Sequence, residues 1–492
     1  MLRALVPLVV GIVVGAFAEV AVCTWAVAAV ACGAMAWLGR KHSISTFYTT
    51  FTILLFGATV ARAHIPRAVV PQGQRVWLEA QITDNPTYRA GRSAHSSGVV
   101  GRWRPETDQT EWRESGERVL VSFDTMYHFT AGDRVVFRGY VNSINDSTDS
   151  YSRLMRARGY TGRTYISQYS HVVVAPNKAS GLVIAVRKFQ AWATSRLQRL
   201  ALPSAEMAVA TAMTTGDRRS ITPTLRQNYS RTGASHLLAV SGLHVGVVFL
   251  IINALLYLLP LARRGHIAKN IVAIAAIWAY AAMVGLAPSV VRAAVMFTGA
   301  QLALASSQAR SGANIMAGTA FVMLAVKPLW LLDISFQLSF IAVAGIMAWF
   351  PTLYRTVESS WRGLNALWGL LLVGAVASVA TMPLVSHTFG VFSPAGILLN
   401  PLIVLTANVI VCFSLLWIIA PVSWLAPVFR WVVGGATWLQ NRVVELAGAV
   451  RGATIEWQMP TWAVFVVYGA MIIFTVWLAS RPPKQKPFEL PK

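Results

Sequence analysis

His236, Ser241 and His244 stand close together in residues 229–246, which read YSRTGASHLLAVSGLHVG. Ser241 and His244 are three residues apart, so they are neighbours if this segment is helical. A serine beside a histidine is the minimum for nucleophilic catalysis, and an intramembrane serine hydrolase is therefore one hypothesis. The segment has no acidic residue that would orient the histidine, and its small residues suit close helix packing. We therefore favour a pore-lining or helix-packing role.

Four further polar residues interrupt apolar sequence, namely Arg292, Asp333, Gln337 and Asn400. Polar and ionisable residues within a membrane are costly and usually functional, so these residues are candidates for a pore lining. The other interpretation pairs Arg292 with Asp333 as a structural contact, or lets Arg292 reach the membrane surface. Asn400 precedes a proline, which fits either a helix break that lines a cavity or a simple loop.

Basic residues gather ahead of this apolar region. Between Arg187 and Arg231 the chain has eight Lys/Arg and two acidic residues, and Asp217, Arg218 and Arg219 are consecutive. Exposed cations would attract a polyanion and hold its phosphates, or they would contact anionic lipid headgroups. The sequence alone supports these two interpretations equally.

The composition predicts a polytopic α-helical membrane protein. Of the 492 residues, 55% are hydrophobic and 12% are charged, whereas a soluble domain carries roughly 25% charge. At about 20 residues for each span, there is room for about 10–12 spans. The apolar runs lie at 5–22, 24–38, 46–61, 237–260, 270–286, 289–307, 311–326, 333–351, 365–385, 395–418 and 462–480, and residues 424–448 fit either a span or an interfacial helix.

Residues 66–178 have a different pattern from the apolar runs. The sequence alternates as in a half-buried strand, with Trp77, Glu79 and Gln81 between Val76, Leu78, Ala80 and Ile82. Several such stretches, separated by turns, predict a small β-barrel or sandwich. An OB-like barrel is one candidate, and that fold often binds single-stranded nucleic acid. Basic residues follow the second apolar run, and lysine and arginine favour the cytoplasmic side. The third apolar run would then carry the chain across the membrane, so residues 66–178 are predicted to be extracytoplasmic.

Six segments resemble the ComEC family, the membrane channels that carry DNA into naturally competent bacteria. The block at 229–246 is the most specific. The others are DSYSRLMRARGYTGRTYIS at 149–167, TTGDRRSIT at 214–222, VGLAPSVVRAAVM at 284–296, KPLWLLDISFQLSFIAVAGI at 327–346 and TMPLVSHTFGVFSPAGILLNP at 381–401. The resemblance implies an OB-like domain outside the membrane and a channel in the cytoplasmic (inner) membrane. That channel would translocate single-stranded DNA into the cytoplasm during natural transformation.

The resemblance also guides the expected domains and site residues. The domains are N-terminal transmembrane helices at 1–65, an extracytoplasmic OB-like β domain at 66–178, basic amphipathic or interfacial helices at 179–235, a channel domain at 236–480 and a basic tail at 481–492. The family-typical positions are Asp217, Arg218, His236, Ser241, His244, Arg292, Asp333, Gln337 and Asn400. Charge adds Arg219 and Arg231 to these candidates for the pore or the DNA path.

One departure from the family bears on catalysis. Many members continue into a metallo-β-lactamase-like domain proposed to degrade the non-transported strand, whereas this sequence has neither an HxHxDH string nor a Walker motif. We therefore expect a short form that is not an enzyme and holds no cofactor or metal. Its expected partners are single-stranded DNA, membrane lipids, a DNA receptor outside the membrane, a separate nuclease, and a cytoplasmic ATPase or helicase. An alternative is a transporter or flippase of another anionic substrate, which would favour inverted repeats, and we find no such repeat.

Overall fold

The computed structural model describes residues 2–480, apart from 19, 39–43, 66–67, 84–86, 90–92, 107–110, 125, 128, 130–131, 145–151, 153–154, 157, 168–171, 176–180, 239, 259–265, 306–310, 358 and 451–453. The basic residues after the second apolar run and the expected tail at 481–492 lie outside the described residues. The chain divides into two compact units. The first unit comprises residues 1–196 and 245–337, and the second unit comprises residues 197–244 and 338–492.

The first unit begins with three apolar helices, α1 (Leu2–Phe17), α2 (Val22–Leu38) and α3 (Ile44–His64). Helix α1 lies against α3 at Gly11 and Gly15, where an added Cβ would overlap the carbonyl oxygens of Leu54 and Ala58. Small residues allow helix backbones to approach closely in a membrane, where dispersion contacts replace the hydrophobic effect. The three predicted N-terminal apolar runs therefore each form a helix.

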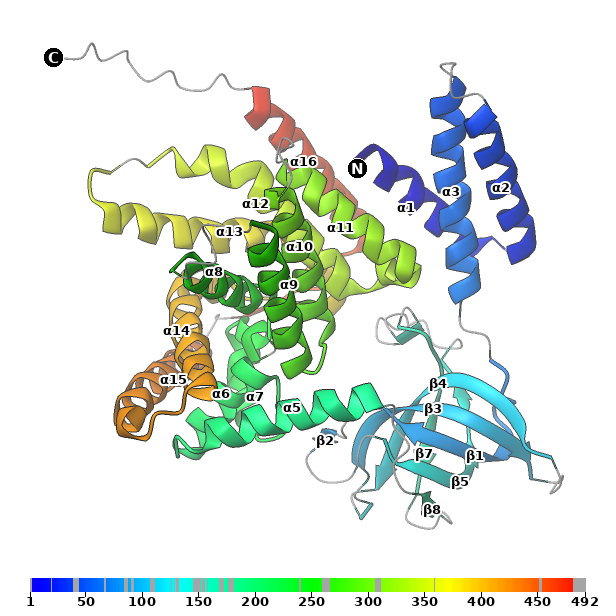
Figure 1. Cartoon of the computed structure of the whole chain (residues 1–492), viewed down its shortest axis with the longest axis horizontal. Helices are drawn as coiled ribbons and strands as arrows, with labels where there is room; N and C mark the ends of the chain where they lie inside the picture. Colours follow the sequence, from blue (N-terminus) through cyan, green and yellow to red (C-terminus); the bar gives the residue numbers. More distant parts are fainter. Residues whose placement is uncertain are drawn as a thin grey trace. The chain divides into compact units, whose positions relative to one another are not determined.

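The strands of the first unit form one sheet, which we call the β domain. It contains β1 (Arg75–Ile82), β2 (Thr87–Arg89), β3 (Ser93–Pro105), β4 (Arg113–Asp124), β5 (Arg134–Tyr140), β6 (Asn142–Ser143), β7 (Tyr160–Ile166) and β8 (Val172–Ala175). Their order is β6-β7-β4-β3-β1-β5-β8, with β2 beside β3. The sheet curves strongly (Figure 1). It is mixed, because β4 and β7 run parallel while the other strand pairs are antiparallel.

The predicted strand alternation is confirmed on β1. Val76, Leu78, Ala80 and Ile82 are buried and pack with the inward side chains of the neighbouring strands. The residues between them form the outer face, where Trp77 lies beside Arg104 of β3 and Arg138 of β5 in the strand register. The period of two thus separates an apolar core from an outer face that is rich in arginine and aromatic residues.

Helix α5 (Gly181–Gln198) follows the β domain, and the second unit continues with α6 (Ser204–Thr215), α7 (Pro223–Arg231) and the short 3-10 helix η1 (Ala234–Leu238). Thr222 caps α7, since its hydroxyl accepts a hydrogen bond from the Leu225 backbone N–H at 3.3 Å. Residues 179–235, for which helices were predicted, therefore contain α5, α6 and α7.

The apolar region forms a series of helices. They are α8 (Gly242–Leu258), α9 (His266–Met283), α10 (Pro288–Ala305), α11 (Gly312–Val326), α12 (Ile334–Tyr354), α13 (Arg362–Phe389), α14 (Pro394–Ile419), α15 (Ala426–Ala449) and α16 (Thr461–Ser480), with the 3-10 helix η3 (Pro328–Leu332) before α12. Among the described residues, α12, α13, α14 and α16 are long and apolar enough to cross a membrane. The chain is accordingly a predominantly helical membrane protein.

Asn400 and Pro401 lie inside α14, so neither interpretation of this dipeptide as a helix break or a loop is correct. Proline removes one backbone hydrogen bond from a helix interior, and neighbouring groups make this tolerable in membrane helices. The chain instead turns just before α14, where α13 ends at Gly390 with φ +67°. A left-handed residue of this kind is a common helix end.

Candidate functional site

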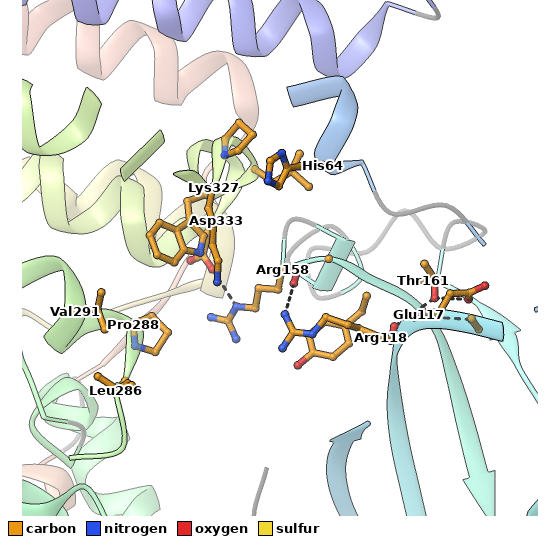
Figure 2. A pocket seen from close by; sticks show the side chains of 18 of the residues that line it. His64, Glu117, Arg118, Arg158, Thr161, Leu286, Pro288, Val291, Lys327 and Asp333 are labelled. Carbon is orange, nitrogen blue, oxygen red and sulfur yellow. Dashed lines mark hydrogen bonds and ion pairs between the residues drawn. The ribbon is translucent and has the colours of Figure 1, made fainter. Parts of the chain in front are cut away.

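Asp333 of the first unit lies at the start of α12 and is 5% exposed. Its Oδ1 accepts a hydrogen bond from the Ser335 backbone N–H at 2.7 Å, which is the contact of a helix N-cap. Its Oδ2 lies 2.9 Å from Nε of Arg158, which precedes β7 (Figure 2). The predicted structural pair of Asp333 with Arg292 is therefore wrong, because the carboxylate faces the end of the helix and meets an arginine of the β domain.

The Arg158–Asp333 pair lies in an open pocket of about 1110 Å³ (Figure 2). One wall comes from β4 and β7, where Arg118 donates to the Arg158 carbonyl oxygen at 3.2 Å. The other wall comes from the α9–α10 loop and from η3, where Lys327 lies 5.1 Å from the ring centre of Trp330. Arginine and lysine side chains thus enter this pocket from both walls.

Glu117 contributes little free negative charge to that pocket. One of its oxygens accepts from the Val70 backbone N–H at 2.6 Å and also contacts the Val69 N–H, and the other accepts from the Thr161 hydroxyl at 2.8 Å. A buried carboxylate with this many donors is satisfied by the protein itself. Its role is therefore to fix the start of β1 against β4 and β7.

Arg292 and Gln337 lie near the same helix start but contact other groups. Arg292 is buried and within electrostatic range of Asp333 and Arg158, and its Nε has no hydrogen-bond partner among the described residues. Gln337 donates to the Leu331 carbonyl oxygen of η3 at 2.8 Å. The structure thus places Arg292, Asp333 and Gln337 near the start of α12, and it adds Arg158, which sequence reasoning missed.

In the second unit, the segment between α6 and α7 carries Arg218 and Arg219, and α7 itself carries Arg226 and Arg231. Arg219 donates to Asp217 from Nε at 2.9 Å and from Nη2 at 2.6 Å. Burial alone would raise the pKa of Asp217, but the hydrogen bonds from Arg219 outweigh it and the pKa lies below the ordinary value. Arg218, Arg226 and Arg231 are exposed.

In the segment at 229–246, Ser241 and His244 do not have the geometry of a catalytic pair. His244 is fully buried, and its Nδ1 accepts from the backbone N–H of Ser241 at 3.3 Å. Within the described part of the chain, neither the Ser241 hydroxyl nor His244 Nε2 has a hydrogen-bond partner. His236 lies 3.1 Å from the Gly233 carbonyl oxygen. A nucleophilic serine needs its hydroxyl on the base, so this arrangement favours the packing role.

A polar network that sequence reasoning missed joins α7, α14 and α15 within the second unit. The buried Tyr229 hydroxyl donates to Asn441 Oδ1 at 2.8 Å and accepts from Gln440 Nε2 at 3.1 Å. Gln440 Oε1 in turn accepts from Thr406 at 3.0 Å. These contacts use two of the polar residues of α15, so those residues face protein and do not decide whether α15 spans the membrane. Asn400 packs separately, beside Gly374 of α13.

The outer face of the β domain carries arginines stacked on aromatic rings. The guanidinium of Arg104 lies 5.5 Å from the ring centre of Trp77 and 5.0 Å from that of Trp112. At the edge of the core, Arg113 lies 5.2 Å from the ring centre of the buried Trp103. Sequence reasoning missed these pairs, although the facing register of β1, β3 and β4 produces them. The available signal was the closeness of tryptophan and arginine in residues 102–113.

Comparison with known proteins adds to this geometry. The family described as "Competence protein" matches residues 213–482, which is more than half of the chain. "ComE operon protein 3" of Bacillus subtilis (strain 168) is 31% identical over 205 residues, covering 41% of this chain and 25% of that protein. An uncharacterized protein of Aquifex aeolicus (strain VF5) is 29% identical over 187 residues, covering 38% of this chain and 41% of that protein. The matches thus span well under half of either relative, and no solved structure matches.

Proposed function

The chain belongs to the competence protein family, and from that premise we propose that it is the channel that passes single-stranded DNA across the cytoplasmic membrane. The family places the chain in competence and DNA uptake, and its apolar helices make it a membrane protein. We propose that the channel passes one strand and that the chain crosses the inner membrane several times. We also propose that it works with a DNA receptor, a separate nuclease, and a cytoplasmic ATPase or helicase.

The observation that carries the proposal is the exposure of three arginines, Arg226 and Arg231 in α7 and Arg218 in the segment before it. We call these three residues the α7 arginines. They lie inside the range that the family matches, and their side chains are open to solvent. Arg218 and Arg226 also repel each other electrostatically, so an anion between them would relieve that repulsion. Exposed arginines attract the phosphates of DNA by releasing counterions, without reading sequence. A channel for DNA of any sequence needs this kind of contact.

The strand order of the β domain supports an OB-like, DNA-binding interpretation of residues 66–178. Strands β5, β1, β3 and β4 lie side by side in that order, which is the spatial order of a Greek key. Strand β7 then joins β4 in parallel as a fifth strand. The OB-fold is a small, partly open Greek-key barrel that binds oligonucleotides on its outer surface. The domain's outer arginines and aromatic rings suit such a ligand.

The segment at 229–246 favours a transport role without catalysis. The Ser241 hydroxyl does not contact His244, so the pair lacks the contact that a serine hydrolase requires. We keep the hydrolase only as an outcome to be tested. A fluorophosphonate probe that labels the chain, and fails to label Ser241→Ala, would establish it.

The test of the proposed function is transformation frequency in a competent host that lacks its own channel. We expect the chain to restore transformation. The variant Arg218→Glu/Arg226→Glu/Arg231→Glu should lose it by tenfold or more at equal membrane levels, because three phosphate contacts become repulsive. Arg442→Glu is the matched control, since Arg442 is an exposed arginine of the same unit that pairs with Glu445.

Two outcomes would contradict the proposal. In one, the chain inserts at normal levels alongside the host's own partner proteins and still gives no transformants. In the other, the triple variant transforms as well as the parent. Arg219 is left unchanged in this design because Asp217 already holds it.

A further inference from the structure

A second pocket, of about 450 Å³, belongs to the β domain alone. Half of its lining residues are apolar, namely Pro71, Val76, Trp103 and Pro105. Val76 of β1 and Trp103 of β3 are also members of the domain's core. We call this cavity the strand pocket.

Polar groups line the same pocket. Arg75 and Arg113 come from the first residues of β1 and β4, and both are exposed. Each lies beside an aromatic ring, because Arg113 is 5.2 Å from the ring centre of Trp103 and Arg75 is 5.9 Å from that of Tyr140. Stacking on a ring limits the motion of a guanidinium while its N–H groups stay available for hydrogen bonds. The two arginines are thus positioned in advance of any ligand.

Trp103 adds an unsatisfied donor. Its side chain is 4% exposed, and its indole N–H has no hydrogen-bond partner among the residues that the structure describes. A buried donor without an acceptor is uncommon in native proteins and calls for an explanation, such as an absent ligand or water. Gln74 and Glu106 are the remaining polar residues of the pocket. The pocket therefore combines apolar walls, hydrogen-bonding groups and two cations.

We infer that the strand pocket receives one unpaired nucleobase of the transported strand, with Arg75 and Arg113 on the adjacent phosphates. The apolar side chains suit the faces of a base, and Gln74 is a hydrogen-bonding group for its edge. The unpartnered indole N–H of Trp103 is a further donor on a lining residue, whereas Glu106 already pairs with Arg138. A base inside a duplex is paired and stacked, and it enters a pocket only after unstacking. The β domain thereby prefers single strands over duplex. This inference rests on the proposed function and adds to it a site that selects single-stranded over double-stranded DNA.

The first experiment measures binding of a fluorescent thymidine oligonucleotide to the full-length chain in lipid nanodiscs. We expect the parent to bind it about fivefold or more tightly than an abasic oligonucleotide of equal length, because only the first carries bases to stack. A blunt duplex should bind as weakly as the abasic strand.

Two variants test the pocket itself. Arg113→Gln removes a cation at an exposed strand end, and Trp103→Phe removes the N–H while keeping an aromatic ring in the core. Each should lower the preference for the base-bearing strand by about threefold or more. Arg163→Gln is the matched control, since Arg163 is an exposed arginine of β7 that does not line the pocket. It should leave the preference unchanged.

A photochemical measurement locates the base directly. An oligonucleotide with 5-iododeoxyuridine is irradiated on the chain, and the adduct is mapped by mass spectrometry. Adducts at Trp103 or its pocket neighbours support the inference. Adducts confined to other regions, or equal binding of base-bearing and abasic strands, would overturn it.

The two proposals fail in distinguishable ways. If the parent restores transformation and binds single strands, while the pocket variants keep the full base preference, only the strand pocket is wrong. If the parent neither binds single strands nor restores transformation, the proposed channel function fails and the pocket inference fails with it.

Discussion

The arginines of the β domain and the α7 arginines are held in opposite ways. In the β domain, Arg104 and Arg113 stack on tryptophans, while Arg102 and Arg134 both pair with Glu79 at 2.9 and 2.8 Å. The α7 arginines are exposed, and two of them, Arg218 and Arg226, repel each other. Fixed arginines suit recognition of one group in one geometry, whereas exposed ones suit capture of a polyanion in many. Changing the first kind should alter stability or selectivity, and changing the second should alter only affinity.

The largest effect should follow from the fixed pair at the start of α12. Asp333→Ala removes the N-cap and leaves Arg158 without its carboxylate, so we expect a loss of about 3 kcal/mol in the free energy of unfolding. Thermal unfolding in detergent or nanodiscs measures it. The exchanged variant Arg158→Asp/Asp333→Arg should recover part of the loss. If the Asp333→Ala protein were as stable as the parent, the Arg158–Asp333 contact would not be a structural one, and the contrast between held and exposed arginines would fail.

A smaller loss of stability is expected inside the second unit, where Tyr229 is fixed and the α7 arginines are not. Tyr229→Phe removes the hydroxyl that satisfies Asn441 and Gln440, and each buried amide left unpaired is costly. We expect about 2 kcal/mol of destabilisation by thermal unfolding. The triple exchange of the α7 arginines to Gln should change stability far less. Equal losses in the two variants would mean that the α7 arginines are also structural contacts.

The next effect concerns binding, and it separates the two kinds of arginine. Each phosphate contact contributes about 0.7 to the slope of log Kd against log salt for single strands. Exchange of the three α7 arginines to Gln should therefore lower that slope by about 2. Arg113→Gln should lower it by less than 1 while reducing the preference for base-bearing strands. Fluorescence anisotropy across a salt series gives both values, and identical changes in the two variants would remove the distinction.

The smallest effect should come from Asp217. Its pKa is lowered in the folded chain, so its contact with Arg219 contributes stability above the unfolded carboxyl pKa of about 3.9 and loses it as the pH falls through the folded pKa. Since Arg219 is largely exposed, we expect Asp217→Asn to cost less than about 1 kcal/mol at pH 7. Melting curves at pH 7 and near pH 3 should show the difference shrinking. A difference that grows in acid would contradict the assignment.

The local elements were predictable from sequence because they depend on short-range patterns. The apolar runs give the helices, and the alternation at Val76–Ile82 gives β1, since each pattern separates one buried face from another environment. The gap between the predicted apolar runs 365–385 and 395–418 contains the turn at Gly390, whereas the break or loop considered at Asn400-Pro401 is absent. A proline in an apolar helix reads as a break, although packing with neighbouring helices makes it tolerable.

The contacts between distant residues were not predictable from sequence. Arg158 and Asp333 are 175 positions apart, and nothing in either segment identifies the other as its partner. The same holds for Tyr229 and Gln440, which are 211 positions apart. Sequence reasoning therefore found Asp333 as a polar residue in apolar sequence, and it offered Arg292 as a partner in only one of its interpretations. It could not find Arg158, because the direction of a side chain at a helix end depends on the tertiary fold.

The Arg158–Asp333 contact has a mechanical consequence. The β domain is an insertion that the chain enters from α3 and leaves through α5, so two covalent connections hold it. Two points of attachment define an axis about which a rigid body can still turn. The ion pair at the start of α12 supplies a third point, and three attachments that do not lie on one line remove that rotation. A force applied to the β domain would then load the Arg158–Asp333 contact, and breaking that contact would restore the rotation.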